Sequence, residues 1–308
     1  MRCQRAVPLN RGRDVVNFSS NVIIGGENVS LRSIPVLICA ALILTTVNPV
    51  QGETRLERGR YLMQSIAACG NCHTPRGPQG ALPGMELAGG LKFEEKPFTA
   101  YSSNITPDKE TGIGKWTDVE LITAIREGKR PDGSLIGPPM PFALYRGMSD
   151  NDVKAIVAFL RSVKPVKNAV AKSEYRMPLP PAWGPPVAKV ADVARKDKVA
   201  YGGYLAGPAG HCIECHSPAG ANGAPDFENR LGAGGFSFTG PWGVSVSTNI
   251  TPIGLERYSD ADLKKVITTG VRPDGSRLKP PMATDYYARM SAADLDALMA
   301  YLRKLPRK

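Results

Sequence analysis

The sequence has 308 residues, with 39 Lys and Arg against 28 Asp and Glu, which gives a formal net charge of +11. This balance favours an acidic protein partner or an anionic membrane face, with a mildly basic solvated surface as the plain alternative. No cluster of Lys and Arg with interleaved aromatic residues is present, so nucleic acid is disfavoured as a partner.

The first predicted segment is a leader with a secretory signal peptide, residues 1–52. Residues 34–47 form an apolar run of signal-peptide length that follows Arg32, and we expect cleavage after Gly52. The run is too short to span a bilayer, and no other stretch approaches about 20 apolar residues. We therefore expect no transmembrane helix in the mature chain.

A pattern of two cysteines and a histidine occurs twice, at residues 69–73 (CGNCH) and 212–216 (CIECH). C-x-x-C-H is the attachment pattern of c-type haem. Two thiols at this spacing can each add to one vinyl group of a porphyrin, and the following His binds the iron. The sequence thus predicts two covalently attached haems, with these residues in the sites: Cys69, Cys72, Cys212 and Cys215 as attachment points, and His73 and His216 as proximal iron ligands.

Two other interpretations of the cysteines are weaker. Structural zinc sites usually place their two halves closer than the roughly 140 residues between these motifs. A redox-active C-x-x-C would need a βαβ context, and the neighbourhood here is rich in Gly and Pro. Neither interpretation explains a His after both second cysteines. Haem attachment also fits a secreted chain, because c-type haem is attached outside the cytoplasm in bacteria.

The two motifs lie in a longer internal repeat. The segment Asn104-Ile105-Thr106-Pro107 returns at residues 249–252, and Pro138-Pro139-Met140 returns at residues 280–282. The repeated Asn104 and Asn249 could hydrogen-bond a haem propionate or could build a turn. The repeat predicts a tandem duplication of one domain.

The predicted organisation has two similar domains and a linker. Six prolines in the linker favour an extended, semi-rigid segment, along which Tyr175, Met177 and Trp183 could pack between the domains. The predicted boundaries are 1–52 for the leader, 53–163 for the first cytochrome c domain, 164–192 for the Pro-rich linker and 193–308 for the second cytochrome c domain.

Each domain is predicted to contain helices and long loops. The three helices start at these predicted positions: near Glu53, Thr117 and Ser149 in the first domain, and near Ala191, Ser259 and Ser291 in the second. Glu120 and Asp262 complete capping boxes with Thr117 and Ser259. No alternating strand pattern of useful length appears, so the predicted fold class is all-α.

Histidine cannot supply the second axial ligand of both irons. The sequence has three histidines, and two of them are already assigned as proximal ligands. His211 directly precedes Cys212 and so lies on the proximal side of its own haem, where we expect an exposed or packing residue. Methionine, lysine or an open coordination position remain.

Two pairs of methionines recur in the repeat. Met148 and Met290 precede the serines that cap the last helices, which is a hydrophobic-staple position. Met140 and Met282 follow rigid Pro-Pro pairs in irregular loops, where no helical pattern explains them. We predict Met140 and Met282 as distal iron ligands.

The assembled motifs resemble a known family. The run NITPDKETGIGKW over residues 104–116, followed by RPDG, PPM and MSDNDVKAIVAFLRS, is similar to the cytochrome c subunits of membrane-bound alcohol and gluconate dehydrogenases. The resemblance covers nearly the whole mature chain and implies two class I cytochrome c domains, with His73 and Met140, and His216 and Met282, as axial pairs. Those subunits typically carry three haem motifs and a C-terminal membrane anchor, whereas this sequence contains two motifs.

The sequence therefore predicts a periplasmic di-haem cytochrome c, either free or peripheral on the inner membrane, rather than an enzyme. Filled axial positions leave no site for O₂ or peroxide, and a thioether ligand raises the reduction potential. The expected donor is a periplasmic dehydrogenase subunit, and the expected acceptor is an oxidase, a quinone pathway or another cytochrome of the respiratory chain. A di-haem redox enzyme, of thiosulfate dehydrogenase or peroxidase type, is the alternative, and a haem sensor or assembly module is a third.

Overall fold

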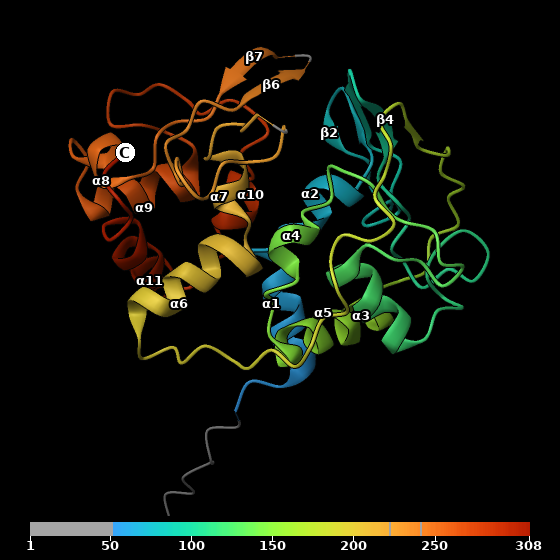
Figure 1. Cartoon of the computed structure of the whole chain (residues 1–308). Coiled ribbons are helices and arrows are strands. Elements are labelled where there is room, and N and C mark those ends of the chain that lie inside the picture. The colour runs from blue at the N-terminus through green and yellow to red at the C-terminus, as the bar shows by residue number, and fades with distance from the viewer. Residues whose placement is uncertain (1–51, 222, 241) are drawn as a thin grey trace, which may run out of the picture. The chain divides into compact units, whose positions relative to one another are not determined.

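Two sets of helices, joined by long loops, make up the part of the chain that the structure describes (Figure 1). The computed structural model describes residues 52–221, 223–240 and 242–308, which belong to one compact unit. Apart from Gly52, the predicted leader over residues 1–52 lies outside this part of the chain. None of the described helices is long and apolar enough to cross a bilayer.

The two sets share the order of their main helices, blue to green and then yellow to red in Figure 1. The first half and the linker contain α1 (Arg55–Gln64), α2 (Cys69–His73), β1 (Arg76–Gly77), β2 (Gly80–Ala81), β3 (Lys92–Glu95), β4 (Phe98–Tyr101), α3 (Asp118–Glu127), α4 (Phe142–Tyr145), α5 (Asp150–Ser162) and β5 (Glu174–Tyr175). The second half contains α6 (Lys198–Tyr204), the π-helical turn η1 (Leu205–Ala209), α7 (Cys212–Cys215), β6 (Ser237–Gly240), β7 (Gly243–Val246), α8 (Pro252–Leu255), α9 (Asp260–Thr269), α10 (Thr284–Tyr287) and α11 (Ala292–Leu302).

Capping side chains start the later helices of each half at the predicted residues. Thr117 and Ser259 each form a complete capping box at the start of α3 and α9. Ser149 and Ser291 each accept a hydrogen bond from the amide three residues on, at the start of α5 and α11. A cap of this kind contributes about 1 kcal/mol to helix stability. These four predicted helix starts are confirmed.

The first helices of the two halves begin differently. Helix α1 follows Thr54, which forms a capping box with Glu57, close to the predicted start. Helix α6 begins only after Asp197, whose side chain accepts from the Ala200 amide. The predicted start near Ala191 is therefore too early, because the true cap lies further along the chain.

The prediction of an all-α fold is wrong. The described residues contain three small antiparallel sheets, β1–β2, β3–β4–β5 and β6–β7. Long loops must pair their own backbone N–H and C=O groups, and these hairpins do so in the loops that follow α2 and α7. In β4, Phe98 and Ala100 are buried while Thr99 and Tyr101 are partly exposed. An alternation over only four residues is too short to recognise in the sequence.

The linker aromatics lie against the first half, not between the halves. The Trp183 ring stacks on Phe142 with ring centroids 5.6 Å apart, and its Nε1 donates to the Ile136 carbonyl at 2.9 Å. The Tyr175 hydroxyl donates to the Pro138 carbonyl at 3.2 Å. The hypothesis that these two side chains fill an inter-domain seam is therefore wrong.

The core of each half is built on a close crossing of its first and last helices. A Cβ atom added at Gly59 of α1 would lie 1.9 Å from the Ala155 carbonyl oxygen of α5. A Cβ atom at Gly202 of α6 would lie 1.9 Å from the Ala297 carbonyl oxygen of α11. Only glycine allows backbones to approach so closely. Both halves therefore depend on a bare glycine where two helices cross.

Replacing either glycine by alanine should force its helix pair apart. For Gly59→Ala and Gly202→Ala we expect the free energy of unfolding to fall by about 1–3 kcal/mol, measured by denaturant unfolding of the mature protein. Gly207→Ala is the matched control, because its Cβ atom would meet only Ile213 Cδ1, at 3.6 Å. Equal unfolding midpoints for Gly59→Ala and this control would contradict the argument.

Candidate haem-binding sites

The four cysteines of the repeated motif lie on two short helices. Cys69 and Cys72 belong to α2, and Cys212 and Cys215 belong to α7. Helical residues three apart lie on one face, so each helix presents its two thiols together. All four cysteines are free thiols and are partly buried. This is the arrangement that two thioether bonds to one porphyrin require.

The chain enters both helices through the same unusual backbone conformation. Ala68 has a φ of 46° and His211 a φ of 44°, both in the left-handed region that non-glycine residues rarely adopt. Each residue directly precedes the first cysteine of its motif. A matching left-handed residue thus sets the direction of each attachment helix.

The pKa values of the four thiols differ from those typical of a redox-active pair. Burial raises the pKa of Cys69 and Cys215 to about 12, and that of Cys72 and Cys212 to about 11. Reactive C-x-x-C cysteines have a lowered pKa, because the thiolate is the nucleophile. Among the described residues, no group of three or more His, Cys, Asp or Glu side chains is placed to hold a metal ion. The residues fit haem attachment better than either alternative.

A backbone carbonyl orients each of the two histidines that are predicted as proximal ligands. His73 Nδ1 lies 2.8 Å from the Ser103 oxygen, and His216 Nδ1 lies 2.7 Å from the Thr248 oxygen. A carbonyl can only accept, so Nδ1 carries the proton and Nε2 keeps its lone pair for a metal. Burial lowers the pKa of both rings, which favours the neutral form that binds iron.

Sequence reasoning missed the two residues that supply these carbonyls. Ser103 and Thr248 each directly precede the repeated Asn-Ile-Thr-Pro segment. Their side chains differ and only their backbone oxygens act, so residue type carried no signal. Their matching position in the repeat was the available clue.

The repeated asparagines build turns. Asn104 Nδ2 donates to the Val166 carbonyl at 2.8 Å, and Asn249 Nδ2 donates to the Lys308 carbonyl at 2.8 Å. Each side-chain oxygen accepts from the amide two residues on. Both side chains therefore fasten the chain that follows the last helix of their half, which favours the turn interpretation over a propionate contact.

The structure separates the two methionine pairs by burial. Met148 and Met290 are 1% and 7% exposed and lie in the core, as the staple prediction requires. Met140 and Met282 are only partly buried, and each follows a Pro-Pro pair whose peptide bond is cis. The assignment of Met140 and Met282 as iron ligands stays a prediction.

The third histidine packs between the halves. The His211 ring meets the Tyr145 ring edge-on, with centroids 5.8 Å apart. Burial lowers the pKa of His211 to about 4 and raises that of nearby Glu214 to about 7. Their 3.9 Å contact is therefore not an ion pair of two charged groups at neutral pH. The interpretation of His211 as a packing residue is confirmed.

Comparison with known proteins identifies the family. The cytochrome c family model matches the chain twice, over residues 56–164 and 203–306. The chain therefore belongs to the cytochrome c family and carries covalently attached c-type haem, with its iron, as cofactor. Each match contains one C-x-x-C-H motif and one Pro-Pro-Met loop.

The relatives include di-haem and dehydrogenase-associated cytochromes. The cytochrome c subunit of alcohol dehydrogenase (quinone) from Gluconobacter oxydans is 34% identical over 275 residues, which cover 82% of this chain and 55% of the relative. The gluconate 2-dehydrogenase cytochrome c subunit of Pantoea cypripedii is 32% identical, over 90% of this chain and 66% of the relative. A diheme cytochrome c-type protein of Cereibacter sphaeroides is 30% identical, over 88% and 95%. The chain spans about half the length of the first of these relatives.

Replacing the loop methionines tests their assignment as ligands. Met140→Leu and Met282→Leu should each remove about half of the weak near-infrared absorption that a methionine–ferric iron bond gives, because leucine has no thioether. Met148→Leu and Met290→Leu are the controls, since they conserve volume in the core and should keep the band. A full band in Met282→Leu would show that Met282 is not a ligand.

Proposed function

We propose that the chain is a periplasmic di-haem cytochrome c that transfers electrons from a dehydrogenase partner towards the respiratory chain. One observation carries the proposal: a complete set of attachment helix, carbonyl-oriented His and Pro-Pro-Met loop occurs twice, once in each family match. Relatives named as cytochrome subunits of dehydrogenases support the donor class. The secretory pattern of the leader supports the periplasm.

The side chains would hold the two haems and keep substrates from the irons, rather than catalyse a reaction. Bound c-type haem supplies a one-electron iron couple. Cys69, Cys72, Cys212 and Cys215 would anchor the two porphyrins, and the carbonyls of Ser103 and Thr248 hold the histidine rings in the iron-binding tautomer. With Met140 and Met282 on the distal sides, no coordination position would be left for a substrate, and the thioethers would raise the potentials.

The haem count can be measured directly. The denatured mature protein should have the mass of the chain plus two haems, and the double variant Cys69→Ala/Cys72→Ala should lose one of them while Cys212→Ala/Cys215→Ala loses the other. Cys-to-Ala variants remove the attachment atoms while leaving each His in place. A wild-type mass with one haem would contradict the di-haem proposal.

Carbon monoxide distinguishes a carrier from an enzyme. The reduced protein should bind no CO, because Met140 and Met282, with His73 and His216, would leave no coordination position open. Met282→Ala is the positive control, since an opened position should bind CO stoichiometrically. Rapid CO binding at one haem of the wild-type protein would instead favour the alternative of a di-haem redox enzyme.

The donor is tested by reconstitution. The oxidised cytochrome should be reduced by a periplasmic dehydrogenase in the presence of that enzyme's substrate, at a rate that falls as salt screens the basic surface of the chain. A rate independent of salt would contradict electrostatic docking, and no reduction by any dehydrogenase of the same periplasm would contradict the proposed donor class.

A further inference from the structure

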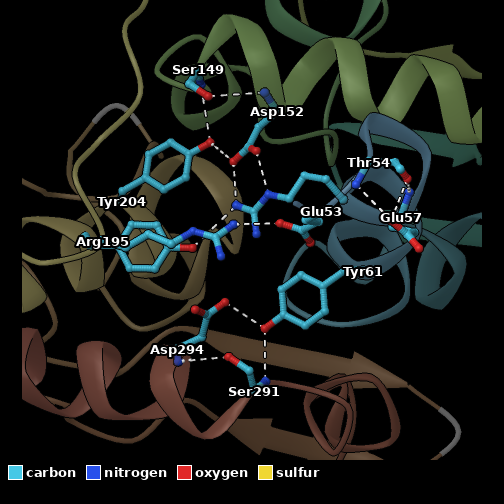
Figure 2. A network of polar contacts seen from close by, with 12 residues as sticks. Glu53, Thr54, Glu57, Tyr61, Ser149, Asp152, Arg195, Tyr204, Ser291 and Asp294 are labelled. Atoms are coloured by element: carbon cyan, nitrogen blue, oxygen red, sulfur yellow. Dashed lines mark hydrogen bonds and ion pairs between the residues drawn. The ribbon is translucent and has the colours of Figure 1, made fainter. Parts of the chain in front are cut away.

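A tyrosine of the second half is bound to the first half. Tyr204, the last residue of α6, donates its hydroxyl hydrogen to Asp152 Oδ2 of α5 at 2.6 Å. The same hydroxyl accepts a hydrogen bond from the Ser149 amide at 3.3 Å. Figure 2 shows the hydroxyl of this tyrosine pointing toward the serine and the aspartate. The hydroxyl therefore joins the capped start of α5 to the other half.

The matching tyrosine of the first half makes the same contacts in the opposite direction. Tyr61 of α1 donates to Asp294 Oδ2 of α11 at 2.7 Å and accepts from the Ser291 amide at 3.0 Å (Figure 2). Tyr61 and Tyr204 precede the two haem motifs at equivalent places in the repeat. We call Tyr61, Tyr204 and the carboxylates of Asp152 and Asp294 the tyrosine clasp.

The two carboxylates and Tyr204 of the clasp are buried, and Tyr61 is partly buried. Asp152 and Asp294 are 7% and 3% exposed. Burial first, and then the bond to Asp294, raise the pKa of Tyr61 to about 12, and burial with Asp152 raises that of Tyr204 further above its usual value. Both hydroxyls thus stay protonated and able to donate. A buried carboxylate that loses its donor is costly, which makes the exchanged bonds specific.

The two sides of the clasp are not equally supported. Arg58 binds Asp152 through two bonds, Nε to Oδ1 at 2.7 Å and a second amino group to Oδ2 at 2.9 Å. The matching position in the second half is Tyr201, which cannot repeat this pair with Asp294. Among the described residues, Tyr61 is the one hydrogen-bond donor to the Asp294 carboxylate. Asp294 therefore depends on the clasp more than Asp152 does.

The haem-attachment segments meet along the same surface. Asn71, inside the first C-x-x-C, donates through Nδ2 to the Pro281 carbonyl of the second Pro-Pro-Met loop at 3.5 Å. A Cβ atom at Gly70 would lie 2.4 Å from the Tyr286 hydroxyl oxygen of α10. The edge-on ring contact of His211 with Tyr145 lies at the same boundary. Each half therefore touches the attachment helix or the segment leading into it in the other half.

We propose that Tyr61 and Tyr204 are positioning residues for direct electron transfer between the two haems. The inference rests on the proposed function, which supplies a haem in each half. The clasp would hold α2 and α7 at one separation, so that one electron leaves one iron, which is oxidised, and reduces the other. The step needs no proton and no co-reactant. The two halves then work as one coupled redox unit rather than as two independent carriers.

The distance between the irons tests the proposal. Pulsed dipolar electron paramagnetic resonance on the fully oxidised protein should give one narrow iron–iron distance distribution. The double variant Tyr61→Phe/Tyr204→Phe should lose this narrow distribution and should exchange electrons between the haems more slowly after photoreduction. Tyr101→Phe, on β4 of the first half, is the matched control and should leave both readouts unchanged.

The unequal support of the two carboxylates gives a sharper outcome. Tyr61→Phe should lower the melting temperature and broaden the distance distribution more than Tyr204→Phe does, because in the second variant Arg58 still binds Asp152 and still donates to the Tyr201 hydroxyl of the second half at 3.4 Å. Asp294→Asn should retain the narrow distribution, since an amide oxygen also accepts from Tyr61. A larger effect of Tyr204→Phe than of Tyr61→Phe on both readouts would overturn the proposal. If the double variant does not accumulate, the comparison of the two single variants is the deciding test.

Failure of the proposed function is recognised separately. The haem content of each protein is measured by mass before the distance experiment. Fewer than two haems in the wild-type protein would refute the di-haem function itself. Two haems together with an unchanged distance distribution in the double variant would overturn the clasp and leave the di-haem function standing.

Discussion

Two buried carboxylates, Asp152 and Asp294, receive hydrogen bonds from tyrosines of the opposite half. Each carboxylate lies in the first turn of the last helix of its half, and each last helix crosses the first helix at a bare glycine. A contact between the halves is thus tied to the core of both. A change in their separation would leave the buried Asp294 carboxylate without its donor and would remove one of the donors to Asp152, and an unpaired buried acceptor is costly.

The matching positions of the two halves are used differently where their residue types differ. Arg58 and Tyr201 occupy one such position, and only the arginine adds an ion pair to the network. Gly137 and Lys279 occupy another. Gly137 leaves room for the Tyr175 ring beside strand β4, whereas Lys279 reaches the edge of β7 and donates to the Val244 carbonyl at 3.3 Å. The repeat therefore keeps the predicted iron-binding segments alike and varies their surroundings.

The polar contacts that orient the two histidines depend on backbone atoms rather than on particular side chains. Each histidine proton is directed at a backbone oxygen, which a side-chain substitution cannot remove. The polar side chains near the sites, such as Asn104 and Asn249, are occupied in turns. A histidine held in one tautomer suits a site that keeps its iron ligand through many redox cycles.

Much of this protein follows from local sequence. The spacing of the cysteines, the histidine after each pair and the capping serines and threonines act over three or four residues, so the sequence predicts the two attachment motifs and the starts of α3, α5, α9 and α11. The strands could not be predicted, because pairing of four-residue segments depends on where the loops come to lie. The prediction that Tyr175 and Trp183 pack between the domains is wrong for the same reason, because their contacts also depend on where a loop comes to lie.

The sequence by itself determined the family chemistry: two attachment motifs, their histidines and the repeat that contains them. Only the tertiary structure decided that Ser103 and Thr248 orient those histidines. It also decided that Tyr61 and Tyr204 each bind an aspartate of the opposite half. Residues 30 or more positions apart meet in the first case and residues of different halves in the second. Such contacts arise when helices pack, and no local pattern of residue types records them.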